Sequence, residues 1–133
     1  MLSGRFLLAV LVITTAISFV QWFFTGFLFH KYQSSTPATW RKESGRSYAA
    51  SVVISLIFAF VFTTIIYVWK ARYGVVSFTD GIKFGIICWA TFSVTIEAGN
   101  AVYVNYSSKF VVGKCISSLV EYMIAGAVAA AFL

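Results

Sequence analysis

Two glutamates, Glu97 and Glu121, lie inside long apolar stretches of the sequence. A charged side chain at the centre of a bilayer costs about 2.5–3.5 kcal/mol on insertion scales. Such a side chain therefore normally faces a partner or a water-filled cavity, as in proton relays and ion pathways. The two glutamates indicate where chemistry can occur, although neither belongs to a recognisable catalytic motif.

Helical spacing places each glutamate on a polar stripe. Side chains at positions i, i+4 and i+7 share one face of a helix. The first apolar stretch carries a further stripe, so three polar faces can meet inside one bundle. The stripes are Ser93, Glu97 and Asn100; Lys114, Ser118 and Glu121; and Thr14, Ser18, Gln21 and Thr25.

The depth of each charged group follows from its distance along the chain from the turn near Tyr106. Glu97 precedes this turn by nine positions and Lys114 follows it by eight. At about 1.5 Å per residue the two groups are nearly level. We therefore predict an ion pair between Glu97 and Lys114 that closes a hairpin. The alternative is that Lys114 extends toward the membrane interface.

Glu121 lies deeper, fifteen positions after the same turn. It is about 9 Å deeper than Glu97 by the same rise, and no cation is level with it. One interpretation is a protonated, hydrogen-bonded carboxyl that only specifies packing. The other is a site that handles protons or cations. The candidate polar site comprises Glu121, Ser118, Ser93, Gln21 and Ser18.

The composition indicates which elements position these groups. The chain is 60% hydrophobic and 11% charged, whereas soluble domains carry about 25% charged residues. Four stretches reach the roughly 20 residues that a transmembrane helix needs, and the first is too long for a signal peptide. We predict an all-α membrane protein with a single domain, residues 1–133, that forms an antiparallel four-helix bundle. The predicted spans are residues 6–29, 48–69, 81–104 and 110–132.

The first connection is the longest and contains the only proline, Pro37. Thr36 as N-cap with Pro37 at the first helical position predicts a short helix. This helix would lie on the headgroups, and a solvated loop that carries topology charges is the alternative. The predicted lipid contacts are Trp40, Arg41, Lys42 and Arg46.

The net charge of +6 does not indicate a nucleic-acid partner. The cations lie mostly in the connections, where they anchor helices at anionic headgroups, and their distribution leans toward first and third connections in the cytoplasm. Membrane lipids are the expected partners. Two pairs of small residues, Gly81 with Gly85 and Gly126 with Ala130, can pack within the bundle. Alternatively they can pack in a homo-oligomer or a larger membrane complex.

No pattern indicates a catalytic, cofactor-binding or metal-binding residue. Cys88 and Cys115 differ in depth by about 13 Å, too far for a disulfide, which needs Cα atoms within about 7 Å. His30 is the single histidine, and no Cys/His cluster has metal-ligand spacing. We expect neither a cofactor nor enzymatic activity.

Several segments carry a resemblance to a known family. They are the run Gln21-Trp22-Phe-Phe-Thr-Gly26-Phe-Leu-Phe29 with the following His-Lys-Tyr, the pair Asp80-Gly81, Trp89, and the run Lys109-Phe-Val-Val-Gly-Lys114. With its four spans, the chain resembles small bacterial integral-membrane proteins of the domain-of-unknown-function family 1761. The resemblance implies a four-helix protein of the bacterial inner membrane and transfers no activity.

These observations favour a non-enzymatic accessory or structural subunit, or a scaffold, in the membrane. The first alternative is a small oligomeric transporter or channel that is proton-coupled and uses Glu121. The second alternative is a lipid-binding protein that uses the basic first connection.

Overall fold

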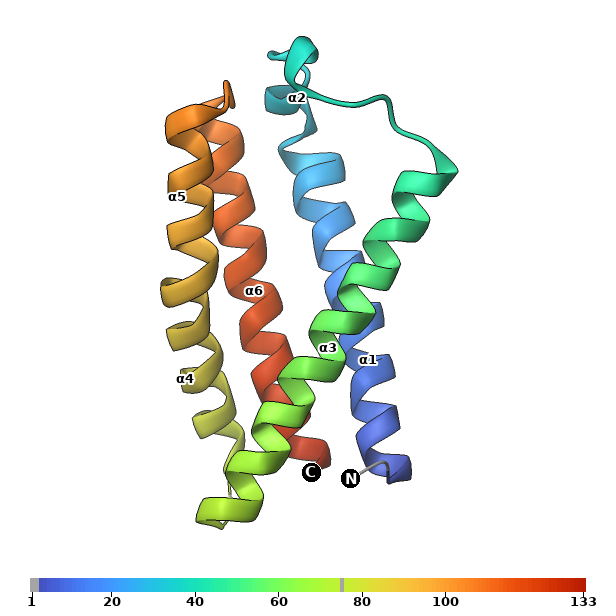
Figure 1. The fold of residues 1–133 in the computed structure, drawn as a ribbon, viewed down its shortest axis with the longest axis vertical. Helices are drawn as coiled ribbons and strands as arrows, with labels where there is room; N and C mark the ends of the chain where they lie inside the picture. Colours follow the sequence, from blue (N-terminus) through green and yellow to red (C-terminus); the bar gives the residue numbers. More distant parts are fainter. Residues whose placement is uncertain (1–2, 75) are drawn as a thin grey trace.

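The computed structural model describes residues 3–74 and 76–133, which form helices and their connections (Figure 1). Four helical segments are long and apolar enough to cross a membrane: Gly4–Leu28, Gly45–Tyr73, Phe78–Tyr103 and Ser108–Phe132. The predicted all-α fold with four spans is confirmed. The protein is a multi-pass membrane protein.

Two of the four spans change their helical geometry partway along. The first begins as α1 and continues as the π-helical segment η1, and the third is divided by the π-helical segment η3. Helix α6 contacts all the other spans, so it is the central element of the bundle. The spans comprise α1 (Gly4–Gln21) and η1 (Trp22–Leu28); α3 (Gly45–Tyr73); α4 (Phe78–Cys88), η3 (Trp89–Ser93) and α5 (Val94–Tyr103); and α6 (Ser108–Phe132).

Serine side chains fix where several helices begin. Ser77 and Asp80 form a complete capping box at the start of α4. A second capping box, between Ser44 and Ser47, starts α3 three residues before the predicted position. Ser107 occupies the N-cap position of α6, but its side chain makes no capping hydrogen bond.

The first connection differs from its prediction. It contains one turn of α2 (His30–Gln33) and one 3₁₀ turn, η2 (Pro37–Thr39), and the chain from Trp40 to Ser44 is not helical. The short helix begins at Pro37 with Thr36 at its N-cap position, as predicted, but it ends at Thr39, so the predicted extension through the basic residues is wrong. The physical reason is Trp40, which adopts an extended backbone and whose ring centroid lies 4.9 Å from that of Phe110.

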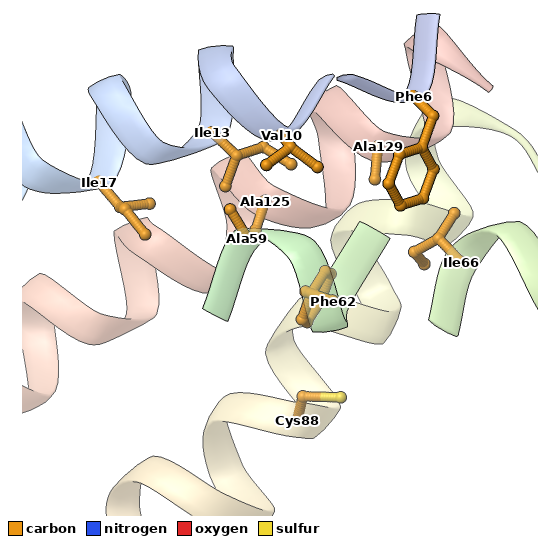
Figure 2. Packing of buried hydrophobic residues seen from close by; sticks show 10 residues of the cluster. All are labelled: Phe6, Val10, Ile13, Ile17, Ala59, Phe62, Ile66, Cys88, Ala125 and Ala129. Carbon is orange, nitrogen blue, oxygen red and sulfur yellow. The ribbon is translucent and has the colours of Figure 1, made fainter. Parts of the chain in front are cut away.

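The apolar core lies in the half of the bundle that contains the chain termini (Figure 2). All four spans contribute to it. In lipid, helices associate mainly through close van der Waals packing, because burial from water contributes little. The cluster contains Phe6, Val10, Ile13, Ile17, Ala59, Phe62, Ile66, Cys88, Ala125 and Ala129.

Glycines bring the backbones of α4 and α6 into direct contact in this half. A Cβ atom on Gly81 would overlap the carbonyl of Gly126, and one on Gly85 would overlap the carbonyl of Tyr122. The Gly81–Gly85 spacing therefore serves packing within the bundle, one of the two predicted uses. An oligomer stays a prediction.

The opposite half of the bundle is more open. Residues 45–54 of α3 are all exposed, and Figure 1 shows this end of α3 standing away from the other helices. The side chain of Tyr48 is 56% exposed, whereas Ser55 and Ala59 farther along the helix are buried. The space between α3 and α1 therefore widens toward the first connection.

Candidate functional site: a polar cavity that reaches Glu121

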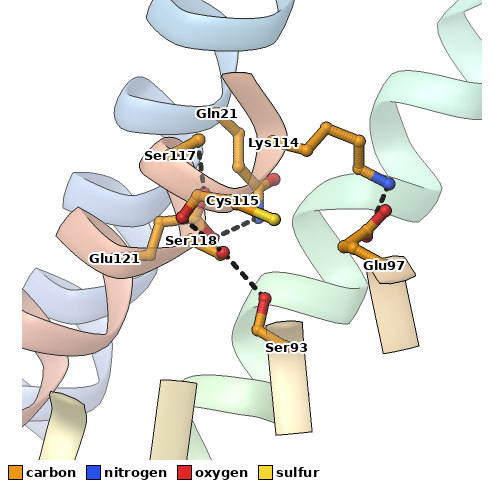
Figure 3. A network of polar contacts seen from close by, with 8 residues as sticks. All are labelled: Gln21, Ser93, Glu97, Lys114, Cys115, Ser117, Ser118 and Glu121. Atoms are coloured by element: carbon orange, nitrogen blue, oxygen red, sulfur yellow. Dashed lines mark hydrogen bonds and ion pairs between the residues drawn. The ribbon is translucent and has the colours of Figure 1, made fainter. Parts of the chain in front are cut away.

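The carboxyl group of Glu121 joins the first and fourth spans. Nε2 of Gln21 donates a hydrogen bond of 3.0 Å to one carboxyl oxygen, and Oγ of Ser117 donates one of 2.7 Å to the other (Figure 3). Glu121 lies near the middle of α6, about 20 Å from its first residue at 1.5 Å per residue. Its two partners are therefore groups inside the bundle.

Glu97 forms an ion pair with Lys114 across the hairpin of the third and fourth spans. Nζ of Lys114 lies 2.7 Å from Oε1 of Glu97, and the side chains are 31% and 14% exposed respectively. The same ammonium group lies 5.9 Å from the ring centroid of Tyr106. The second carboxyl oxygen of Glu97, Oε2, is buried and has no hydrogen-bond partner among the described residues.

Neutral hydrogen bonds hold the same hairpin one turn deeper. Oγ of Ser93 donates to Oγ of Ser118 at 2.7 Å, and Ser118 in turn donates to the carbonyl of Cys115 at 3.1 Å. The indole Nε1 of Trp89 donates to that carbonyl at 2.9 Å. The Ser93–Ser118 bond, drawn in Figure 3, and the bond from Trp89 fix the third span against α6 beside Glu121.

The two π-helical segments flank this network. Gln21 immediately precedes η1, and Ser93 ends η3. Within η1, the hydroxyl of Thr25 donates to the carbonyl of Gln21 at 2.7 Å, which gives this carbonyl a partner. π-Helical turns are rare and occur frequently at functional sites.

An inner cavity of about 280 Å³ adjoins Glu121. All of its lining residues are polar or charged, and they include the Glu97–Lys114 ion pair and the carboxyl group of Glu121 with its two partners. The lining residues are Gln21, Thr25, Glu97, Lys114, Ser117, Ser118 and Glu121.

An outer cavity of about 390 Å³ lies under the first connection, between the first, second and fourth spans. It shares Gln21, Thr25 and Lys114 with the inner cavity. The two together extend from the first connection to the carboxyl group of Glu121. The outer wall comprises Ser18, Gln21, Trp22, Thr25, Gly26, Gln33, Trp40, Glu43, Tyr48, Ser51, Val52, Phe110 and Lys114.

The structure brings most of the predicted polar site together. Gln21 and Glu121 are bonded, as are Ser93 and Ser118, whereas Ser18 lines the outer cavity and its buried hydroxyl has no partner among the described residues. That these residues form a functional site stays a prediction.

Three further residues of this region are not among the predicted site residues. Ser117 is four positions before Glu121, so helical spacing alone was sufficient to identify it. Tyr48 and Ser51 line the outer cavity from α3. They have no such signal, because their role depends on the angle at which α3 leaves the bundle.

The predicted lipid contacts separate into two groups. Trp40 packs against Phe110 and Tyr106, and its indole donates to the hydroxyl of Thr36 at 3.2 Å, so it roofs the outer cavity. The cations are exposed and line neither cavity. They are Arg41, Lys42 and Arg46.

Residues 3–74 and 76–133 contain no group of three His, Cys, Asp or Glu side chains that could hold a metal ion. Cys88 and Cys115 are both free thiols.

Comparison with known proteins places the chain in a family. The family described as Protein of unknown function (DUF1761) matches residues 8–130. No curated protein and no solved structure matches the chain at a significant level. The matched region covers most of the first and fourth spans, all of the second and third, and the residues that line both cavities. The chain therefore belongs to this family of unknown function.

Proposed function

We propose that the protein is a small, non-enzymatic transporter that binds a polar solute within the membrane and exchanges a proton at Glu121. One observation carries the proposal. Two cavities that share Gln21, Thr25 and Lys114 extend from the first connection to a carboxyl group in the middle of a span. A carboxyl group at that depth, beside a polar cavity, is the usual element of a membrane proton relay.

The partners of Glu121 suit both protonation states of its carboxyl group. A carboxylate accepts the hydrogen bonds that Gln21 and Ser117 now donate. A protonated carboxyl must also donate one bond, and both partners can accept it: a hydroxyl is donor and acceptor, and a rotated amide presents its oxygen. The partners of Glu121 can therefore hydrogen-bond to the carboxyl group in either protonation state.

Access to Glu121 comes from one side of the membrane. The half of the bundle nearer the termini is filled by the apolar core, in which Ala125 and Ala129 continue α6 directly beyond Glu121. We assign the open side to the cytoplasm of a bacterial inner membrane, because the cations favour cytoplasmic first and third connections. Transport then requires a second arrangement of the helices that opens the other side.

A structural subunit or scaffold is the second candidate, and one observation favours it. Both oxygens of Glu121 already accept hydrogen bonds from within the chain. Under this proposal the carboxyl group only joins the first span to α6. Lipid binding through the first connection has less support, because Trp40 packs inward on Phe110.

Infrared difference spectroscopy on the protein in lipid nanodiscs separates the two candidates. Proton exchange requires a carboxylic C=O band that changes with pH, shifts in D₂O and disappears in Glu121→Gln. Glu97→Gln is the control, because Glu97 is paired with Lys114 and its loss should leave the band in place. A band that is unaffected by both pH and D₂O would reject proton exchange and leave the structural candidate.

A further inference from the structure

The outer cavity combines aromatic walls with a polar floor. Four aromatic rings line it, and each comes from a different part of the chain. The ring centroid of Trp40 lies 4.9 Å from that of Phe110 in edge-to-face geometry, so these two rings are held in place. The aromatic residues are Trp22, Trp40, Tyr48 and Phe110.

Hydrogen-bond acceptors outnumber available cations in the two cavities. Three carboxyl groups line them: Glu43 at the outer rim and Glu97 and Glu121 within. Lys114 is the single cation among the lining residues, and Glu97 already engages it. Oε2 of Glu97 is buried with no partner in residues 3–74 and 76–133, as is the hydroxyl of Ser18.

We infer that the solute is an organic ammonium ion, a cation with N–H donors and an apolar body. This inference rests on the proposed function, since it names the class of solute for the same cavity. The carboxyl groups of Glu43, Glu97 and Glu121 supply the counter-charge for the ammonium group. The apolar body lies between the aromatic rings of the outer cavity. The faces of these rings also attract the ammonium group where it lies within about 6 Å of a ring centroid.

The size and the entrance of the cavity fit this class. The outer cavity holds about 390 Å³, within the roughly 300–1,000 Å³ that is usual for small-molecule sites. Glu43 lies at the rim and accepts a hydrogen bond of 2.6 Å from the hydroxyl of Tyr48. It supplies negative charge beside an aromatic ring at the entrance. Arg41 and Lys42 are exposed and do not line the cavity.

Binding of three matched probes to the full chain in nanodiscs tests this inference. Phenethylammonium, 2-phenylethanol and phenylacetate share an aromatic body and differ in charge. We expect saturable binding of phenethylammonium, measured by calorimetry and by tryptophan fluorescence, and none of phenylacetate. Glu43→Gln and Trp40→Leu should each weaken binding of the ammonium about tenfold, which corresponds to about 1.4 kcal/mol. Lys42→Gln, outside the cavity, should leave the affinity unchanged.

The charge of the probe decides the outcome. In Glu97→Gln, Lys114 loses its counter-ion, so phenethylammonium binding should fall and phenylacetate binding should appear. Equal binding of the three probes to the unaltered protein, or no saturable binding of phenethylammonium, would overturn the inference. Because Glu43 lies at the exposed rim, Glu43→Gln gives a folded variant even if Trp40→Leu loosens the connection.

The infrared titration of Glu121 on the same samples keeps the two proposals apart. A titrating Glu121 without ammonium binding rejects the solute class alone. Selective ammonium binding with a Glu121 that does not titrate rejects proton exchange alone.

Discussion

The two halves of this bundle, on either side of Glu121, consist of different kinds of residue: one half is closely packed and the other contains the cavities. Toward the termini, the carbonyl of Gly126 lies directly against Gly81, and apolar side chains fill the space between the helices. Toward the first connection, α3 stands away and polar side chains line two cavities. Close packing in the half near the termini therefore stabilises the bundle, and the half near the first connection can contain cavities.

The sequence of helix α6 differs between the two halves in the same way. Its first half carries Lys114, Ser117 and Glu121, and its second half, beyond Glu121, is rich in alanine with one glycine, Gly126. Small residues permit close backbone approach, which is the main source of helix association in lipid. The polar residues of the first half instead bond across the helices, as Glu121 does with Gln21 and Ser118 with Ser93.

The largest expected effect is on the packed half. In Gly126→Val the new Cβ would overlap the carbonyl of Gly81, so we expect a loss of stability of about 3 kcal/mol, the upper end for overpacking. Thermal unfolding in detergent, followed by circular dichroism, measures it. Gly99→Val is the matched control, because nothing lies within 4 Å of the position of a Cβ on Gly99. Equal losses in both variants would contradict the packing account.

A smaller effect should follow from breaking the ion pair in the hollow half. Lys114→Glu leaves Glu97 without its cation, which we expect to cost about 2 kcal/mol, as for other charged hydrogen bonds. Glu97→Lys should cost a similar amount by the same measurement. The double variant with both changes restores an ion pair across the hairpin and should recover stability. No recovery over the single variants would show that the pair does not hold the hairpin together.

Two serines, Ser117 and Ser18, allow the effect of losing one hydrogen bond to be measured. Ser117→Ala removes a donor to Glu121 and should cost about 1 kcal/mol. Ser18→Ala removes a hydroxyl that has no partner in the described part of the chain, so it should cost nothing measurable. Chemical denaturation of the two variants side by side is the measurement. A greater loss in Ser18→Ala would show that the hydroxyl of Ser18 has a structural role.

The smallest effect on stability is expected at Glu121 itself. In Glu121→Gln the amide can accept the bond from Ser117 and can pair with a rotated Gln21. We therefore expect a change within about 0.5 kcal/mol, as for substitutions without a named defect. Proton uptake by vesicles that contain the variant should nevertheless be lost. A variant that retains full proton uptake would remove Glu121 from the proposed mechanism.

Much of the fold could be predicted from the sequence because membrane spans have a strong signal. Length and hydropathy located the four spans, and counting from the turn placed Glu97 level with Lys114. Both arguments depend only on regular helical rise. The prediction that Gln21 is a neighbour of Glu121 used the same rise together with the three polar stripes.

The remaining features depend on tertiary packing, which single helices do not encode. The π-helical turns at Trp22–Leu28 and Trp89–Ser93 change the helical register of the polar stripes in the first and third spans. No local sequence pattern predicts these turns. The sequence predicts that Trp40 is an interfacial anchor. In the structure its ring packs on Phe110, which lies seventy positions later in the sequence. The outer cavity exists because α3 leaves the bundle at an angle, which the mainly apolar sequence of this helix does not specify.

Thiol accessibility tests the difference between the two halves most directly. Single cysteines replace Ser18 and Ile13, five positions apart on α1, in a background of Cys88→Ser and Cys115→Ser. A charged thiol reagent that does not cross the bilayer is added to either side of sealed vesicles. We predict labelling at position 18, which lines the outer cavity, from the side of the first connection alone, and no labelling at position 13, which is fully buried in the core. Equal labelling at both positions, or labelling at position 18 from the terminal side, would contradict a hollow half closed by a packed one.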